Sequence, residues 1–164
     1  MLLAFAALVY AEPAAPECPP AQECTAAAIG FVAGTSLDEV RAALAAHPEG
    51  VALTLTAGAR PWTAEELEAL VYRSKEATNL RALVLSGNPV GDAGAMAIAA
   101  SPHLGRLTTL DLRGCKVREA GARGLAYSEG LGALTLLTLD GRGIGVRGRE
   151  ALKARFGAVV ILAE

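Results

Sequence analysis

The sequence predicts an α/β fold in which repeated strand–helix units stack into a solenoid, because the same pattern of apolar residues returns at a fixed interval. Three observations predict it: a step of 27 residues aligns three copies, each copy opens with a strand-like alternation, and a helix-like spacing follows. At 164 residues, the chain suits one domain with a single core.

Composition limits what the core and the partners can be. Apolar residues make up 52% of the chain and aromatic residues only 4%, so Leu, Ala and Val must build the core. A formal net charge of -2 provides no field that would concentrate nucleic acid or anionic lipid. Nucleic acid is therefore not an expected partner.

Residues 1–11 are expected to be a secretory signal peptide. An apolar run from Leu2 to Val9 precedes a small-x-small cleavage pattern that ends at Ala11. The run is too short for a stable membrane span, which needs about 20 apolar residues. No Lys or Arg precedes Arg41, so the basic segment that usually opens such a peptide is missing. We expect export to the periplasm or the extracellular space; a cytoplasmic chain with an apolar tail is the alternative.

Residues 12–35 are expected to be a linker. Cys18 and Cys24 lie in it, and an oxidising compartment would allow them to form a disulfide bond. A Cys-x5-Cys pair without a second pair or a nearby His is a weak zinc signal. No metal site is therefore expected.

The single domain is expected to occupy residues 36–164 and to begin with a helical cap at residues 36–50. Ser36 and Glu39 have the spacing of a capping box, which predicts the start of a helix. Such a cap covers the apolar end that a stack of repeats otherwise exposes.

A degenerate repeat is expected to follow at residues 51–79. Leu53 and Leu55 fit the strand leucines of the later copies. Thr63 and Glu66 have the spacing of a second capping box and predict a helix after the strand.

Three regular repeats are expected at residues 80–106, 107–133 and 134–157, and a terminal strand at residues 158–164 caps the stack. Six sets of residues recur at the 27-residue step: Leu80, Leu107 and Leu134; Leu83, Leu110 and Leu137; Leu85, Leu112 and Leu139; Val90, Val117 and Ile144; Gly94, Gly121 and Gly148; Ile98, Leu125 and Leu152. Six aligned columns predict one structural unit per copy.

Each unit is expected to combine one strand and one helix. Alternation places Leu83 and Leu85 on one face of a strand. Gly94 and Ile98 are four residues apart, so they share the inner side of a helix, and the glycine is expected to let that helix approach the strand layer. One unit cannot bury its apolar face alone, whereas stacked neighbours cover each other.

Residues 80–157 resemble the leucine-rich repeat of the ribonuclease-inhibitor class, in which LxxLxL precedes the helix. The resemblance implies a right-handed solenoid with a short curved parallel sheet and with helices on its convex side. It also implies that position 88 and its equivalents turn a side chain inward to satisfy backbone groups. Asn88 and Cys115 fit this ladder role, whereas Arg142 at the third such position breaks the pattern.

The resemblance further implies that a protein partner would use the concave surface of the sheet. Adjacent copies place Arg113 beside Asp140, and an exposed ion pair between them is one expectation. The surface lacks the aromatic residues of many binding hot spots, so an inert concave surface is the alternative. The candidate binding residues are those that point outward from the strands or directly follow them: Val84, Ser86, Thr109, Asp111, Arg113, Leu136, Thr138 and Asp140.

No residue set predicts catalysis or a cofactor. Residues 143–148 satisfy GxGxxG, but the repeat columns account for this motif better than a dinucleotide site does. His47 and His103 have no spaced partner, and Cys115 is expected to be buried rather than nucleophilic. Charged residues of the helical stretches, Arg149 among them, are expected to be solvated.

The sequence therefore predicts a monomeric, non-catalytic scaffold that binds a protein of unknown identity. One alternative is a regulator of a GTPase or signalling protein, by analogy with other proteins of the ribonuclease-inhibitor type. A second is an enzyme with an unrecognised site.

Overall fold

The computed structural model describes residues 27–31, 35–58 and 60–163. The expected signal peptide at residues 1–11 and the Cys18–Cys24 pair lie outside these described residues. Within the described part of the chain, no helix is long and apolar enough to cross a membrane.

A six-stranded sheet organises the described residues, and its strands follow the order of the chain from β1 to β6. Every neighbouring pair is parallel. The strands are β1 (Ala27–Phe31), β2 (Val51–Leu55), β3 (Leu80–Val84), β4 (Thr109–Leu112), β5 (Leu136–Asp140) and β6 (Val160–Ala163).

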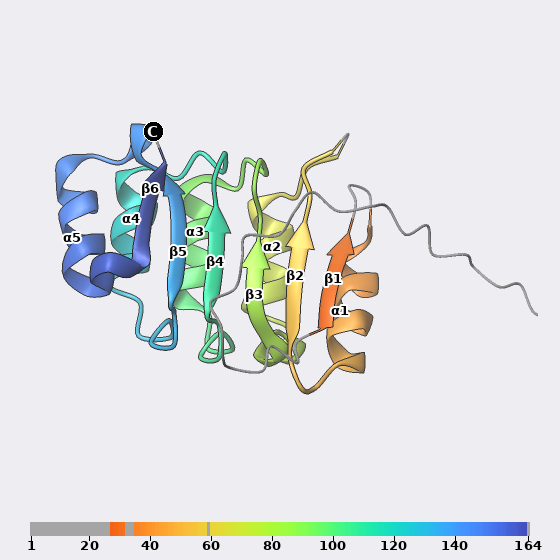
Figure 1. Ribbon diagram of the computed structural model, residues 1–164. Coiled ribbons are helices and arrows are strands. Elements are labelled where there is room, and N and C mark those ends of the chain that lie inside the picture. Colours follow the sequence, from red (N-terminus) through yellow and green to blue (C-terminus); the bar gives the residue numbers. More distant parts are fainter. Residues whose placement is uncertain (1–26, 32–34, 59, 164) are drawn as a thin grey trace, which may run out of the picture.

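The α-helices alternate with the strands, and those described lie on one side of the sheet (Figure 1). They are α1 (Leu37–Ala46), α2 (Ala64–Val71), α3 (Gly91–Ala100), α4 (Glu119–Ala126) and α5 (Val146–Phe156). Short 3₁₀ helices occupy Lys75–Asn79, Gly141–Gly143 and Gly157–Val159. The α/β solenoid that the 27-residue step predicts is confirmed.

The strand register follows the leucine columns. Leu83 pairs with Leu110, and Leu110 pairs with Leu137. All three side chains are fully buried, and they belong to one continuous apolar core. Burial of one leucine side chain contributes about 2 kcal/mol. Every regular unit adds equivalent leucines, so the repeat itself supplies the core.

The sheet begins earlier than the sequence predicts. β1 lies inside residues 12–35, the segment predicted to be a linker, and pairs in parallel with β2. The linker prediction is therefore wrong for residues 27–31. The segment reads AAIGF and lacks the leucine pattern, because an edge strand needs fewer buried side chains. Ile29 and Phe31 are only partly buried against the core.

The capping boxes locate the starts of α1 and α2. Ser36 Oγ accepts a hydrogen bond from the Glu39 backbone N–H at 3.3 Å, and Glu39 Oε2 accepts one from the Ser36 N–H at 2.8 Å. Thr63 and Glu66 make the same reciprocal pair. Both helix starts depend on contacts between residues three positions apart, which a sequence pattern records directly.

The glycine column allows helices to pack against one another. A Cβ atom at Gly121 would lie 2.6 Å from Asp92 Oδ1 and 2.9 Å from Ala95 Cβ, both on α3. A Cβ atom at Gly148 would lie 3.3 Å from the Ala122 Cβ atom on α4. The prediction that this glycine lets its helix approach the strand layer is therefore wrong. The glycine brings each helix close to the helix of the preceding unit.

Hydroxyl side chains tie successive units together. Ser128 Oγ donates to the Ala99 carbonyl at 2.6 Å, and Ser101 Oγ donates to the carbonyl of the last residue of α2. Thr108 and Thr135 also donate to carbonyls of the preceding unit. Ser101 and Ser128 are 27 residues apart, and so are Thr108 and Thr135. The sequence therefore contains a polar repeat signal in addition to the apolar columns.

Candidate functional site

The helix-free sheet face is the side of the sheet that is turned away from the described α-helices. The strand register aligns Val84, Asp111 and Thr138 in one row across β3, β4 and β5. Thr109 and Leu136 are paired in the next row. These candidates are half-buried except Asp111, which is buried. The structure therefore gathers them on one surface.

The remaining candidates follow the ends of the strands at the same edge of the sheet. Ser86 is half-buried in the turn after β3, and Asp140 is half-buried at the end of β5. Arg113 is exposed in the turn after β4. The turns after parallel strands thus extend the helix-free sheet face at its carboxyl edge.

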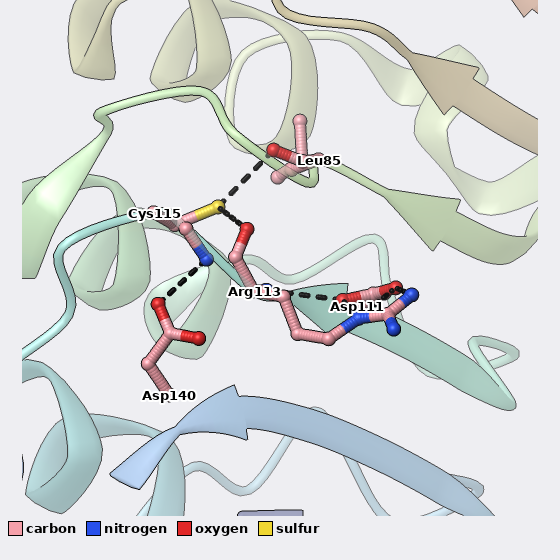
Figure 2. A network of polar contacts seen from close by, with 6 residues as sticks. Leu85, Asp111, Arg113, Cys115 and Asp140 are labelled. Carbon is pink, nitrogen blue, oxygen red and sulfur yellow. Dashed lines mark hydrogen bonds and ion pairs between the residues drawn. The ribbon is translucent and has the colours of Figure 1, made fainter. Parts of the chain in front are cut away.

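Asp111 and Arg113 form an ion pair with several contacts (Figure 2). Arg113 Nη2 donates to Asp111 Oδ2 at 2.6 Å, and Arg113 Nε lies 3.0 Å from each carboxylate oxygen. The Arg113 backbone N–H also donates to Asp111 Oδ1 at 3.0 Å. The Asp111 side chain is 10% exposed and the Arg113 side chain is 56% exposed. A nearly buried carboxylate thus orients a guanidinium that solvent can still reach.

Asp140 does not pair with Arg113, so the predicted ion pair is wrong. Asp140 Oδ2 instead accepts a hydrogen bond from the Gly114 backbone N–H at 2.6 Å (Figure 2). Asp111 and Arg113 are two positions apart and project to the same face, so Arg113 reaches the nearer carboxylate. Hydrogen bonding and charge from Asp111 raise the pKa of Arg113, and the charge of Asp140 adds to this effect.

The ionisation of Asp111 reflects two opposing effects. Burial raises the pKa of the Asp111 carboxyl. Hydrogen bonds from the Arg113 side chain and backbone lower this pKa, and together the lowering effects outweigh the effect of burial. The resulting pKa lies below the ordinary value of 3.8. Asp111 is therefore ionised at neutral pH and holds Arg113 as a fixed ion pair.

Asn88 occupies the ladder position after β3 and is fully buried. Its Nδ2 group donates to the Leu55 carbonyl at 2.7 Å and to the Leu85 carbonyl at 3.1 Å. Its Oδ1 atom accepts a hydrogen bond from the Trp62 backbone N–H at 2.8 Å. One amide side chain thereby joins the turn after β3 to the preceding unit.

Cys115 occupies the ladder position after β4. Its Sγ atom lies 3.1 Å from the Leu85 carbonyl oxygen, and the side chain is fully buried (Figure 2). Burial raises the pKa of the Cys115 thiol to about 12. Nucleophilic chemistry needs the thiolate, so this thiol has a structural role.

Arg142 leaves the third ladder position without an inward side chain, because it is exposed. Arg149 on α5 acts in this turn instead. Its Nε atom donates to the Ile144 carbonyl at 2.9 Å, and its Nη2 atom donates to the Gly141 carbonyl at 2.5 Å. Arg149 is exposed, and in addition it supplies hydrogen-bond donors to this turn. The repeat columns gave no signal for this contact, since Arg149 lies outside them.

The GxGxxG segment is a contact surface for a carboxylate of the preceding unit. A Cβ atom at Gly145 would collide with Glu119 Oε2, and one at Gly148 would lie 3.1 Å from the same oxygen. Asp92 takes the equivalent place one unit earlier and accepts the Arg118 backbone N–H at 2.7 Å. A dinucleotide phosphate would meet the negative charge of Glu119 at the start of α5.

The histidines do not join a larger polar cluster among the described residues. His47 Nδ1 lies 3.0 Å from Glu49 Oε1, and the His103 backbone N–H donates to Ser101 Oγ. In residues 27–31, 35–58 and 60–163, no group of three His, Cys, Asp or Glu side chains could hold a metal ion.

The family model described as Leucine Rich repeat matches residues 76–99 and 107–126. These segments carry β3 with most of α3, and β4 with α4. The two matched units are therefore leucine-rich repeats, and the alternating strands and helices with one all-parallel sheet have the architecture of an α/β leucine-rich-repeat solenoid. A search of curated protein sequences finds no match to the chain.

Proposed function

We propose that the chain is a non-catalytic scaffold whose helix-free sheet face binds a protein partner around Asp111 and Arg113. Leucine-rich repeats generally mediate protein–protein interaction. The observation that carries the proposal is the Arg113 guanidinium, which a nearly buried carboxylate orients while more than half of the side chain remains exposed.

The orientation of Arg113 reduces the entropic cost of binding. A free arginine side chain loses rotamer freedom when a partner immobilises it. Asp111 already restrains Arg113 through Nε and Nη2, and the remaining guanidinium N–H groups can donate to a carboxylate or carbonyl of a partner. Arginine is also enriched among the residues that dominate binding energy.

The neighbouring surface supports contact at this point. Val84, Leu136 and Thr138 are half-buried and have compact side chains, so a partner can approach the sheet closely. Contacts that exclude water around a central charged residue strengthen its hydrogen bonds. We therefore propose Arg113 as the centre of the interface and these three side chains as its surroundings.

The proposal extends to the subtype, the assembly state and the location of the protein. The LxxLxL pattern and the inward Asn88 and Cys115 support the ribonuclease-inhibitor class. We propose a monomer that is exported after cleavage behind Ala11, on the pattern of residues 1–11. Mass measurement of the protein recovered outside the cytoplasm tests export, and an intact Met1 in a cytoplasmic protein would contradict it.

Affinity capture with matched arginine variants tests the interface. Arg113→Ala removes the oriented guanidinium, whereas Arg123→Ala removes an exposed guanidinium from α4 on the other side of the sheet. We expect a partner to be retained by the wild type and by Arg123→Ala, and to bind Arg113→Ala about tenfold or more weakly. Equal retention by both variants would exclude Arg113 as the centre.

A second variant tests the surface without changing the ion pair. Thr138 is half-buried at the middle of β5, so Thr138→Arg would place a long side chain over the helix-free sheet face. We expect loss of the partner with an unchanged circular dichroism spectrum. Undiminished binding by a folded Thr138→Arg protein would place the interface elsewhere.

A further inference from the structure

A cleft lies between the turns that follow β4 and β5, at the carboxyl ends of these strands. Its volume is about 430 Å³. The residues that line it are Lys116, Val117, Arg118, Asp140, Arg142 and Gly143. Two consecutive units therefore contribute to one cleft.

The cleft carries an excess of positive charge. Lys116, Arg118 and Arg142 are exposed, and none of them forms an ion pair within the described part of the chain. Asp140 is the only acidic residue in the lining, and its carboxylate accepts the Gly114 backbone N–H. Three cations against one carboxylate leave a formal excess of two positive charges.

This concentration of charge does not stabilise the fold. Like charges repel, so three cations in one lining provide no favourable pairing among themselves. Lys116 also has a φ angle of 58°, a left-handed conformation that costs a residue with a Cβ atom about 1–2 kcal/mol. A glycine or asparagine would adopt it more readily.

The preceding junction between units has a different lining, in which Arg113 and Lys116 stand one 27-residue step before Asp140 and Gly143. Residues one 27-residue step earlier are Pro89 in place of Lys116 and Gly91 in place of Arg118. Cys115, which is buried, stands in place of Arg142. The three residues that supply the cations of this cleft are therefore not set by the repeat columns.

We propose that the cleft binds a phosphate monoester, a property independent of the protein partner proposed above. A phosphate monoester carries about −1.5 to −2 charge at pH 7, which matches the excess in the cleft. Arg118 and Arg142 supply forked donors for phosphate oxygens, and Lys116 supplies an ammonium group. A carboxylate carries one negative charge and would neutralise only half of the excess.

Titration with three probes tests this site. Inorganic phosphate, a phosphoserine peptide and its unphosphorylated form are added at low ionic strength, and the amide signals of Lys116 and Gly143 are followed by nuclear magnetic resonance. We expect saturable binding of the phosphoserine peptide with one site per chain, weaker binding of inorganic phosphate, and no binding of the unphosphorylated peptide.

Variants separate a built site from general attraction. Arg142→Ala and Lys116→Asn each remove one cation, and asparagine still accepts the left-handed backbone. Each should raise the dissociation constant for the phosphoserine peptide about tenfold. Arg123→Ala on α4 removes the same charge outside the cleft and should leave the constant unchanged.

Three results would overturn the proposal. The first is a response to the phosphoserine peptide that never saturates. The second is equal weakening by Arg142→Ala and Arg123→Ala, which would indicate attraction by net charge alone. The third is equal affinity for inorganic phosphate and the phosphoserine peptide, because the esterified group would then contribute nothing.

Discussion

The turns after β3 and β5 occupy the same place in two units of the solenoid, yet different residues satisfy their backbone groups. After β3, Asn88 is fully buried and bonds both its own turn and the preceding unit. After β5, Arg142 points to solvent, and Arg149 reaches back from α5 to two carbonyl groups.

The difference between these turns shows which physical requirement is common to the two positions. The requirement is that the carbonyl groups of the turn have donors, because an unpaired buried backbone group costs about 1–3 kcal/mol. A short amide can meet it from inside the turn. A long guanidinium can meet it from the next helix, which leaves Arg142 free to line the cationic cleft.

The reactivity of the Cys115 thiol tests whether the turn after β4 is as well buried as the turn that contains Asn88. The pKa of its thiol is raised from 9.0 to about 12 by burial, so the thiolate fraction at pH 8 is about 1,000-fold lower than for an ordinary thiol. We expect alkylation of Cys115 to be slower by about this factor in the folded protein than in denaturant. Mass spectrometry of the Cys115 peptide measures the two rates, and similar rates would show that the turn opens readily.

Asn88→Ala should produce the largest loss of stability among the turn variants. It leaves the Trp62 N–H and the Leu55 carbonyl without their side-chain partner, so the free energy of unfolding should fall by about 3 kcal/mol. Asn79→Ala is the matched control, because Asn79 makes one bond, to the Leu44 carbonyl, and should cost about 1 kcal/mol. Urea unfolding compares them, and equal losses would remove the special role of Asn88.

Arg149→Ala and Arg142→Ala test the turn after β5. Arg149→Ala removes the donors to the Gly141 and Ile144 carbonyls and should reduce the free energy of unfolding by about 1.5 kcal/mol. Arg142→Ala removes an exposed side chain and should change it by less than about 0.5 kcal/mol. Urea unfolding of both variants decides which arginine supports the turn, and the reverse order would contradict the assignment.

Arg113→Ala should have a small effect on stability, and the effect should depend on pH. The lowered pKa of Asp111 means that its contribution is present above about pH 4 and is lost as pH falls through the folded-state pKa. Because Arg113 is exposed, the loss at pH 7 should be below about 1 kcal/mol.

Without Arg113, burial becomes the main influence on Asp111, so the pKa of Asp111 should rise. Nuclear magnetic resonance titration of the carboxyl group measures this change. Arg123→Ala is the control and should leave the titration of Asp111 unchanged. A lowered Asp111 pKa in Arg113→Ala would show that another group supplies the stabilising hydrogen bonds.

The repeat explains why so much of the fold follows from the sequence. Leu83, Leu110 and Leu137 are buried because each lies on the same face of a strand, and the unit before and after presents the same face. The capping boxes of α1 and α2 connect residues three positions apart. Regular spacing and local contacts are visible in a linear pattern.

Polar contacts of the candidate site depend on choices that a linear pattern does not resolve. Asp111 and Asp140 both lie within 27 residues of Arg113 in the sequence. Arg113 pairs with Asp111, and Asp140 accepts the Gly114 backbone N–H instead. Arg149 reached Gly141 because the first turn of α5 lies beside the turn after β5. The energies of such exposed pairs differ by about 1 kcal/mol or less, so small differences in position choose between them.

β1 and the cationic cleft are two further features that the sequence pattern did not predict. AAIGF carries too weak an apolar pattern to be recognised as a strand, and pairing with β2 along its full length makes it one. Lys116, Arg118 and Arg142 come from two units and meet only where the turns after β4 and β5 adjoin. Apolar periodicity therefore specified the leucine layers, because burial acts on whole columns, whereas side-chain geometry assigned the charged contacts, because each one needs particular atoms within about 3 Å.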